Sequence, residues 1–390
     1  MVHHARKQWD KVWRRRVLGT MLCVLLCLSG TGNVWGQKAA EDENAERAVV
    51  EAVTISGNKR TKTKVITRNL TFAVTQEISL EDMETLIERN ENNIYNTGLF
   101  NVVEMTYEKG EGTIRFHIEV VERWYIWPIP YLSLEERTFN EWWEDKDLDR
   151  LVYGLGVEWQ NFTGWNDRLY LYAQNGYSRR INAQLRRPFI FGGPLTDALF
   201  SYSYLSNREI GYATEGGYLQ LARLQNAQIR NNHSGSVLFS HRLTPRRQIQ
   251  LSFGYQHFTL HDSIRHFNPL YLTDNNLVEQ YPFIGLAFVN DQRDLFSFPL
   301  KGHKLSFSAR KLGLFGWGTS DFAKLTASWS HHIPLEKRWN FAYGMQSFLL
   351  LGKEVPYYDK YFVGFGSFLR GYENFVIDGS FINLLKFEWK

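Results

Sequence analysis

From about residue 124 to the end of the chain, apolar and polar side chains alternate in segments of roughly ten residues. The clearest segment alternates Ile249, Leu251, Phe253 and Tyr255 with Gln250, Ser252, Gly254 and Gln256. A period of two is typical of a β-strand with one apolar and one polar face. The same pattern recurs at 199–205, 325–330 and 339–346. We therefore predict about a dozen antiparallel strands between Ile126 and Lys390.

Residues 49–123 follow a different pattern, which predicts a small α+β domain. Strands are expected at 49–55, 102–107 and 113–121, and Thr61 or Thr63 is expected to cap a short helix. Ser79 is expected to open a second helix with Asp82 in a capping-box variant. The apolar stripe of that helix would be Met83, Leu86, Ile87 and Ile94. The predicted order is strand, helix, helix, strand, strand (βααββ).

The first 36 residues have the features of a secretory signal peptide. A basic segment precedes an apolar stretch at 17–28, which is too short to span a membrane as a helix. Cleavage is expected before Gln37, and an uncleaved N-terminal anchor is the alternative. Both cysteines, Cys23 and Cys27, lie in this segment, so the mature chain would have no disulfide.

Charge and composition narrow the class of protein. The first 36 residues carry six Lys/Arg and one Asp, and removing that net of +5 from the chain's +4 leaves about −1. Binding to nucleic acid is therefore not expected. The chain is 44% hydrophobic and 15% aromatic with a mean hydropathy of −0.36. Together with the signal peptide, these values favour a transmembrane β-barrel over a secreted β-sandwich, which remains the alternative.

The predicted boundaries follow from these patterns. We expect a signal peptide at 1–36, a flexible leader at 37–48, the α+β domain at 49–123 and the barrel at 124–390. Trp124, Tyr125 and Trp127 lie where the barrel would begin. They fit an interfacial aromatic girdle, and a packed hinge is the alternative.

Residue patterns for catalysis or metal binding are weak. There is no Gly-x-Ser-x-Gly elbow for a serine hydrolase and no phosphate-binding glycine loop before a helix. His331 and His332 are adjacent in a predicted strand and would point to opposite faces. The acidic, tryptophan-containing segment 135–149 is interpreted as a solvated loop, with a cation site as the alternative. We expect no enzymatic activity, no cofactor and no metal.

Two motifs in the α+β domain carry a family resemblance. The segment 55–61 contains Gly57 and Asn58, and the segment 96–101 reads Asn-Thr-Gly-Leu-Phe-Asn. The second includes Thr97, Gly98, Leu99 and Phe100. With the βααββ order, these motifs resemble a POTRA domain. Any other small α/β domain is the alternative.

The second half carries motifs that resemble the BamA/TamA superfamily, the bacterial surface antigen family of outer-membrane proteins. The principal motif follows a run of glycines and aromatics and comprises Leu369, Arg370, Gly371 and Tyr372. A hairpin motif comprises Asp291, Arg293, Asp294, Pro299 and Gly302. An early hairpin at Asn161–Gly164 adds to the resemblance. In the family, the motif arginine reaches into the barrel lumen and is held by the barrel wall.

The resemblance implies a POTRA domain in the periplasm and an antiparallel transmembrane β-barrel of the sixteen-stranded family type in the bacterial outer membrane. The pattern here stops after about 12 strands, so we expect a truncated barrel, with closure by a smaller barrel or by a partner as the alternative. The implied function is insertion, assembly or translocation of client proteins. A two-partner-secretion-type exporter and a passive pore or surface antigen are the alternatives.

The implied partners are outer-membrane lipids, unfolded client proteins that add a strand at the POTRA edge, and accessory envelope proteins. Because the sequence has one POTRA pattern, an accessory relative of the central assembly protein is favoured.

Overall fold

The computed structural model describes residues 46–390 except 136–142, 144–147, 194, 225–226, 273–275, 337–338, 353–354, 365–368, 370–371 and 373–374. The predicted signal peptide and most of the predicted leader lie outside the described residues.

The N-terminal part is a four-stranded sheet with two helices. Its elements are β1 (Arg47–Ser56), α2 (Thr63–Thr67), β2 (Glu77–Ser79), α3 (Met83–Tyr95), β3 (Phe100–Lys109) and β4 (Thr113–Glu122). The sheet order is β2-β1-β4-β3, with β1 parallel and β3 antiparallel to β4. Ile114, Phe116 and Ile118 alternate along β4 and are at most 1% exposed, so one face of this sheet carries the core.

The predicted order is extended by one strand, and one helix start is wrong. Residues 77–79 form β2, which the sequence did not signal because the strand is only three residues long. Since Ser79 belongs to that strand, α3 begins at Met83 instead. Asp82 is the N-cap residue, but its side chain makes no capping hydrogen bond. The predicted stripe is confirmed at Met83 and Ile94, which are buried.

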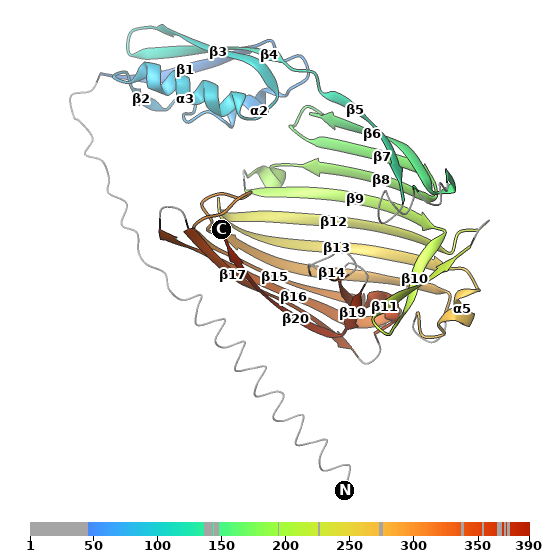
Figure 1. The fold of residues 1–390 in the computed structure, drawn as a ribbon. Coiled ribbons are helices and arrows are strands. Elements are labelled where there is room, and N and C mark those ends of the chain that lie inside the picture. Colours follow the sequence, from blue (N-terminus) through green and yellow to red (C-terminus); the bar gives the residue numbers. More distant parts are fainter. Residues whose placement is uncertain are drawn as a thin grey trace. The chain divides into compact units, whose positions relative to one another are not determined.

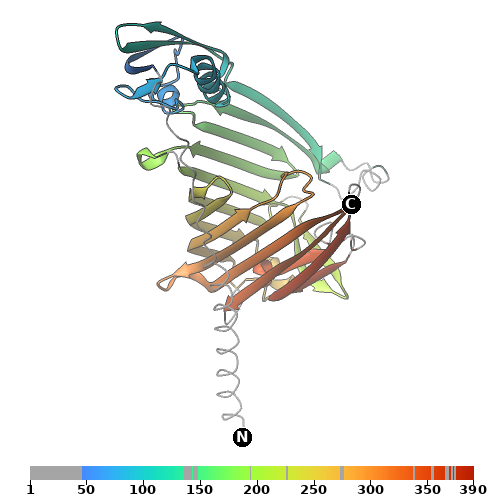
Figure 2. The same ribbon diagram turned by 90° about the vertical axis from the view of Figure 1, so that its left-hand side faces the viewer.

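The remainder of the chain forms a 12-stranded antiparallel sheet in which strands pair in chain order. Figures 1 and 2 show this succession from green (β5) to red (β20). The first strands are short: β5 (Ile126–Leu134), β6 (Leu151–Gln160), β7 (Arg168–Gly176), β8 (Ser178–Arg187) and β9 (Thr196–Asn207). The later ones are β12 (Arg230–Thr244), β13 (Arg247–Leu260), β14 (Val278–Asp291), β15 (Gly302–Leu314), β16 (Trp317–Glu336), β17 (Trp339–Gly352) and β20 (Phe381–Trp389).

The pairing register separates the two faces of this sheet. Cross-strand partners share a face, and Phe200, Val237 and Phe253 form one continuous row. The neighbouring row carries Ser201 and Ser236. A sandwich would bury the apolar rows, yet Phe200 is 44% and Phe253 is 42% exposed. The sheet therefore presents its apolar face outward, as a membrane barrel does.

Helices contribute little to this half. Short turns η1 (Leu148–Arg150) and η2 (Ile190–Gly192) and the four-residue helix α5 (Ile264–Phe267) lie in connections between strands. Among the helices in the described part of the chain, none has the length and apolarity needed to cross a membrane.

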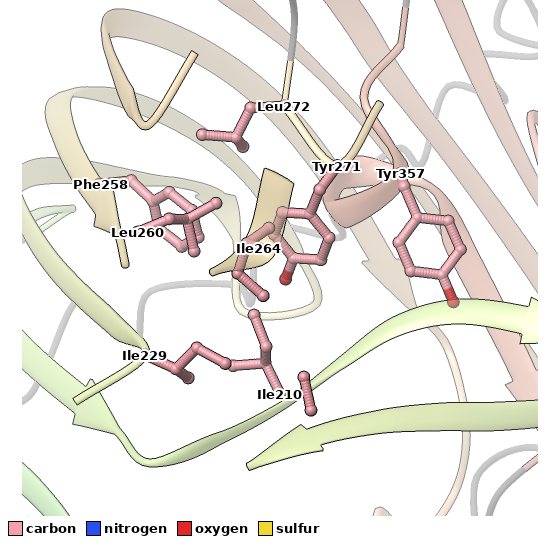
Figure 3. Packing of buried hydrophobic residues seen from close by; sticks show 9 residues of the cluster. Ile210, Ile229, Phe258, Leu260, Ile264, Tyr271, Leu272 and Tyr357 are labelled. Carbon is pink, nitrogen blue, oxygen red and sulfur yellow. The ribbon is translucent and has the colours of Figure 1, made fainter. Parts of the chain in front are cut away.

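A hydrophobic cluster lies at the ends of the long strands (Figure 3). It joins the hairpin β10 (Glu209–Glu215) and β11 (Tyr218–Arg223) to residues from β13 and α5. Its buried members are Ile210, Ala222, Ile229, Phe258, Leu260, Ile264, Tyr271, Leu272 and Tyr357. Burial raises the pKa of Tyr271 to about 12. The cluster was not predicted, because its members come from several elements and connections between β10 and η4.

Candidate functional site

The segment between β17 and β20, residues 353–380, folds back onto the polar face of the sheet, and we call it the β17–β20 loop. It contains η4 (Tyr357–Asp359) and an antiparallel hairpin of β18 (Tyr361–Gly364) and β19 (Val376–Gly379). Tyr357, Val363 and Val376 are each less than 9% exposed. The described part of this loop is therefore packed rather than solvated.

Two ion pairs fix the loop. Lys324 on β16 donates to the Asp359 carboxylate, and the Asp359 side chain is 3% exposed. Within the loop, Lys360 Nζ lies 2.9 Å from Asp378 Oδ2. The first pair spans the loop and the sheet, so it holds η4 against the polar face. A buried pair of this kind is costly to break, because either partner alone leaves an uncompensated charge.

A second carboxylate lies near this pair. Glu279 on β14 is 1% exposed, and neither of its oxygens has a hydrogen-bond partner among the residues that the structure describes. No group of three or more His, Cys, Asp or Glu side chains in the described ranges is arranged to hold a metal ion.

The tyrosines of η4 extend the contact to β10, β13 and β14. The Gln256 side-chain amide donates to the Tyr358 hydroxyl at 2.7 Å. The Tyr281 and Tyr358 hydroxyls are 3.4 Å apart, and the Phe258 and Tyr358 rings stack at 4.6 Å. On the other side of η4, the Tyr357 hydroxyl lies 2.8 Å from Thr214 Oγ1 on β10. The loop is thus held by strands β10, β13, β14 and β16.

The predicted lumen-loop motif falls in this loop, but its central part lies outside the described residues. Leu369 and Tyr372 are described, whereas Arg370 and Gly371 are not. The Tyr372 ring lies 6.1 Å from that of Phe375. The role assigned to Arg370 remains a prediction. Sequence reasoning missed Lys324 and Asp359, although a lysine on the polar face of a strand and an acid in an aromatic segment were visible signals.

The predicted hairpin motif forms a compact turn between β14 and β15. The Arg293 guanidinium donates to both Asp291 oxygens, at 2.7 and 2.6 Å. Asp294 Oδ1 accepts the backbone N–H groups of Leu300 and Lys301, both at 3.1 Å. These bonds, led by the one from Lys301, lower the pKa of Asp294.

The other two residues of this motif support the turn through burial and backbone conformation. Pro299 is buried. Gly302 has φ of +101°, and a Cβ there would lie 2.3 Å from the Gln292 carbonyl oxygen. These residues therefore shape the turn between β14 and β15, and a functional role for the motif stays a prediction.

The predicted POTRA motif residues support the N-terminal domain from two loops. Gly57 has φ of +85°, and a Cβ there would lie 1.9 Å from the Val120 carbonyl oxygen. Asn58 Nδ2 donates to the Thr61 carbonyl at 2.9 Å. In the second loop, Thr97 Oγ1 donates to the Ile94 carbonyl at 2.6 Å and so caps the end of α3.

The remaining POTRA motif residues follow that cap. Gly98 has φ of +73°, and Leu99 and Phe100 are at most 3% exposed. These residues lead the chain from α3 into β3.

The outer edge of the N-terminal sheet is the second candidate site. At the hairpin, Gly110 N donates to the Thr113 carbonyl at 2.8 Å, so these two residues form a hydrogen-bonded pair. Counting back along β3 from this pair, every second residue bonds to β4 and the residues between them do not. Val103, Met105 and Tyr107 therefore direct their backbone groups away from β4. The Met105 amide is occupied, because it donates to Glu91 Oε1 of α3 at 2.7 Å.

These observations define a class: an outer-membrane β-barrel protein with a POTRA domain in the periplasm. Residues 161–382 match the model of the Omp85 superfamily domain, and residues 48–123 match the POTRA model, described as a surface antigen variable number repeat. The chain belongs to the Omp85 superfamily.

Solved structures support the fold. BamA from Haemophilus ducreyi lacking POTRA domains 1–3 matches with a TM-score of 0.61 and 18% identity, over 83% of this chain and 60% of that chain. CdiB from Acinetobacter baumannii matches with a TM-score of 0.50 and 13% identity, over 88% of this chain and 60% of that chain. The chain therefore spans about three-fifths of the length of both. A search of curated protein sequences finds no significant match.

Proposed function

We propose that this protein assists the insertion, assembly or translocation of client proteins at the outer membrane. The proposal is supported by two sheets joined in one Omp85 chain. In the periplasmic sheet no described strand pairs with the outer side of β3, and the membrane sheet has an apolar outer face. No nucleotide is required, because burial of the client's apolar band in lipid supplies the free energy.

The first step of the scheme is capture at β3. An extended client segment would bond to the outward backbone groups of Val103 and Tyr107, so affinity would come from main-chain contacts that do not demand one client sequence. Glu91 already holds the Met105 amide between them. A client strand must displace this carboxylate, so Glu91 limits capture to segments that pair along the whole edge.

The second step occurs at the barrel. The β17–β20 loop is fixed on the polar face by the Lys324–Asp359 pair, and Arg370 is proposed to brace the same loop. A fixed loop would hold the strands on the polar face in place while a client strand pairs at an edge of the sheet. Accessory envelope proteins would act on the periplasmic domain.

Deletion of the gene tests the proposal. We expect particular outer-membrane proteins to be depleted and to recover when the full chain is supplied. Glu91→Ala should change client recovery by altering capture, whereas Glu88→Ala, on the exposed face of the same helix, should not. Steady conductance in planar bilayers, together with unchanged outer-membrane protein levels in the deletion strain, would instead identify a passive pore and reject the proposal.

A further inference from the structure

The outward, apolar face of the membrane sheet has a groove of about 610 Å³ that extends from β7 to β13. Gly235 of β12 lines this groove between its cross-strand partners, Tyr202 on β9 and Tyr255 on β13. The two tyrosines are 43% and 48% exposed, and cross-strand partners share a face, so Gly235 faces lipid. The volume of the groove lies in the range of pockets that bind small molecules.

The space above Gly235 is left open by its neighbours. A Cβ at this position would have no heavy atom within 4 Å. The Tyr202 hydroxyl lies 3.0 Å from His233 Nδ1, and the Tyr255 hydroxyl donates to Gln280 Oε1 at 3.1 Å. His233 and Gln280 belong to the next row towards the start of β12. Both tyrosine rings therefore lean in that direction, held by hydrogen bonds, and neither covers the glycine.

The backbone does not require a glycine at this position. Glycine inside a strand weakens the strand, and it marks a bulge, a tight bend or the close approach of a ligand. The pairing of β12 with β9 and with β13 passes through Gly235 without a register shift, so there is no bulge. Gly235 is also not among the glycines with positive φ. A side chain would fit both the backbone and the space, so the glycine keeps the groove accessible.

The two ends of the groove differ in chemistry. On one side of Gly235, the next row on the same face is the apolar row that contains Val237. On the other side, Tyr204, His233 and His257 are direct cross-strand partners. The His233 ring lies 4.7 Å from the Tyr204 ring and 6.4 Å from the His257 ring. The first end suits a hydrocarbon chain, and the second offers N–H and O–H donors.

The charges around the polar end favour an anionic group. The fully described strands β8, β12 and β13 contain no Asp or Glu, and the one acid of β9, Asp197, pairs with Ser240 on the polar face. Arg179 of β8 is two positions from Ile181, which is 47% exposed, so the arginine adds a positive charge to the outward face. A phosphate at this end would meet donors and a cation, with no carboxylate on the outward face of these strands.

We propose that this groove binds one lipid of the outer leaflet, with an acyl chain over Gly235 and a phosphate of the headgroup at His233. Strands alternate in direction from β5, which follows the periplasmic domain, so β12, the sixth strand of the sheet, starts on the outer side of the membrane. When the Tyr202 hydroxyl donates to His233 Nδ1, Nε2 carries the ring proton and can donate it to a phosphate oxygen. The inference is independent of the proposed function, because no client takes part in it.

Apolarity alone does not retain a lipid at this groove, because the surrounding acyl chains are equally apolar. Retention comes from close packing of one chain in the space that the tyrosines leave open, and from hydrogen bonds to the headgroup. Filling the space at Gly235 or removing the donor at His233 should therefore release the lipid while the rest of the outward face is unchanged.

Photolabelling with two defined lipids tests the site. The full chain in dodecyl maltoside micelles receives a phosphatidylglycerol that carries a diazirine on one acyl chain, or a diacylglycerol with the same labelled chain. Mass spectrometry of the digested protein locates the adducts. We expect them to concentrate on β9, β12 and β13 around Gly235. Phosphatidylglycerol should label this site about fivefold more than diacylglycerol, which is the effect of one additional hydrogen bond.

Three variants separate the two parts of the site. Gly235→Leu fills the groove and should abolish labelling there. His233→Phe keeps a ring but removes the donor, so labelling by phosphatidylglycerol should fall to the level of diacylglycerol. Ala327→Leu is the matched control: Ala327 pairs with Phe307, which is 42% exposed, so it adds the same bulk to the outward face on β16 and should leave labelling unchanged. If Gly235→Leu fails to fold on a semi-native gel, Gly235→Ala, which adds only a methyl group, should fold and label less.

Four outcomes overturn the inference. They are adducts spread evenly over the outward face, equal labelling by the two lipids, unchanged labelling of Gly235→Leu or, where that variant does not fold, of Gly235→Ala, and a disulfide between two copies of Gly235→Cys in place of lipid capture. The last result would assign the groove to a second copy of the chain. Client levels in the deletion strain judge the proposed function separately, whatever the labelling shows.

Discussion

Lys324 on β16 is paired with Asp359 of η4, a residue 35 positions later in the chain. The pair joins the wall of the sheet to the β17–β20 loop at a site where the acid is almost completely buried. The loop follows β17 in the chain, so the pair attaches it to β16, a strand to which it is not directly connected. The pair thus adds a buried electrostatic contact to the hydrogen bonds and ring contacts that hold the loop.

Removing one member of this pair should destabilise the barrel more than removing both. Lys324→Met or Asp359→Asn alone leaves a buried group without its partner, which costs about 3–5 kcal/mol. Lys324→Met/Asp359→Asn should cost less than the sum of the two single changes. Urea unfolding in lipid vesicles measures these differences. Lys311→Met is the control, because Lys311 and its partner Asp321 are solvent-accessible and such pairs contribute less than about 1 kcal/mol.

Arg370→Ala should weaken the barrel or reduce client assembly. The prediction follows from the family resemblance, in which this guanidinium supplies several donors that brace the loop. The measurement is the temperature at which the folded band disappears on a semi-native gel, together with client levels in cells. Arg265→Ala, in the segment between β13 and β14, provides a comparison. Unchanged band temperature and normal client levels would contradict the role assigned to Arg370.

Two glycines of the POTRA domain should differ sharply in their tolerance of alanine. Both have positive φ, but a Cβ at Gly57 would lie 1.9 Å from the Val120 carbonyl oxygen, whereas nothing lies within 4 Å of one at Gly98. Gly98→Ala should cost about 1 kcal/mol from backbone strain alone, and Gly57→Ala should cost several times more because β4 must move. Limited proteolysis of the full chain reports on this domain. Equal sensitivity of the two variants would show that the β1–β4 packing adjusts freely.

The two faces of β13 should respond oppositely to a charge. Leu251→Lys places an ammonium in the exposed apolar row and should destabilise the barrel by about 2–4 kcal/mol. Gln250→Lys, one residue away on the polar face, should cost much less. Folding yield into vesicles and urea unfolding measure both. Similar losses for the two variants would mean that the apolar row does not meet lipid.

The turn between β14 and β15 should loosen in acid. The pKa of Asp294 is lowered by backbone N–H groups, foremost that of Lys301, so its ionised form favours the folded turn. This contribution is complete above the unfolded pKa of about 3.9 and is lost as pH falls through the lower folded value. Pepsin cleavage at the exposed Leu295, Phe296 and Phe298 should therefore rise below about pH 4.

Asp294→Asn separates this effect from the pH dependence of pepsin itself. The variant should be cleaved readily at every pH, so the ratio of variant to unmodified cleavage should approach one as the pH falls. A constant ratio across the range would exclude Asp294 as the group responsible.

The strands of the membrane sheet were predictable because alternation is a local signal. Ile249 through Gln256 lies within β13, and Trp339 through Gln346 lies within β17, as expected. The two short hairpins, β10–β11 and β18–β19, were not predicted. They pair outside the main sheet and owe their position to the buried cluster around Ile210 and Tyr357, which no local window contains.

The candidate site was predictable in outline only. The sequence located the β17–β20 loop and the turn at Asp291 through family motifs, and the Asp291–Arg293 contact lies within three residues of chain. The Lys324–Asp359 pair could not be predicted, because it depends on how η4 packs against β16, and the two residues are 35 positions apart in the chain.

Strand length varies across the sheet. Strands β5 to β8 and β20 have 9 or 10 residues, whereas β12 to β17 have between 13 and 20. A tilted strand needs about 9–11 residues to cross the hydrocarbon core. The short strands are only just long enough to cross the hydrocarbon core, so they determine the position of the protein along the membrane normal. The long strands can shift along that normal and still span the core. In a thicker bilayer the mismatch falls on β5 to β8 and on β20, and the lipid beside these strands must thin first.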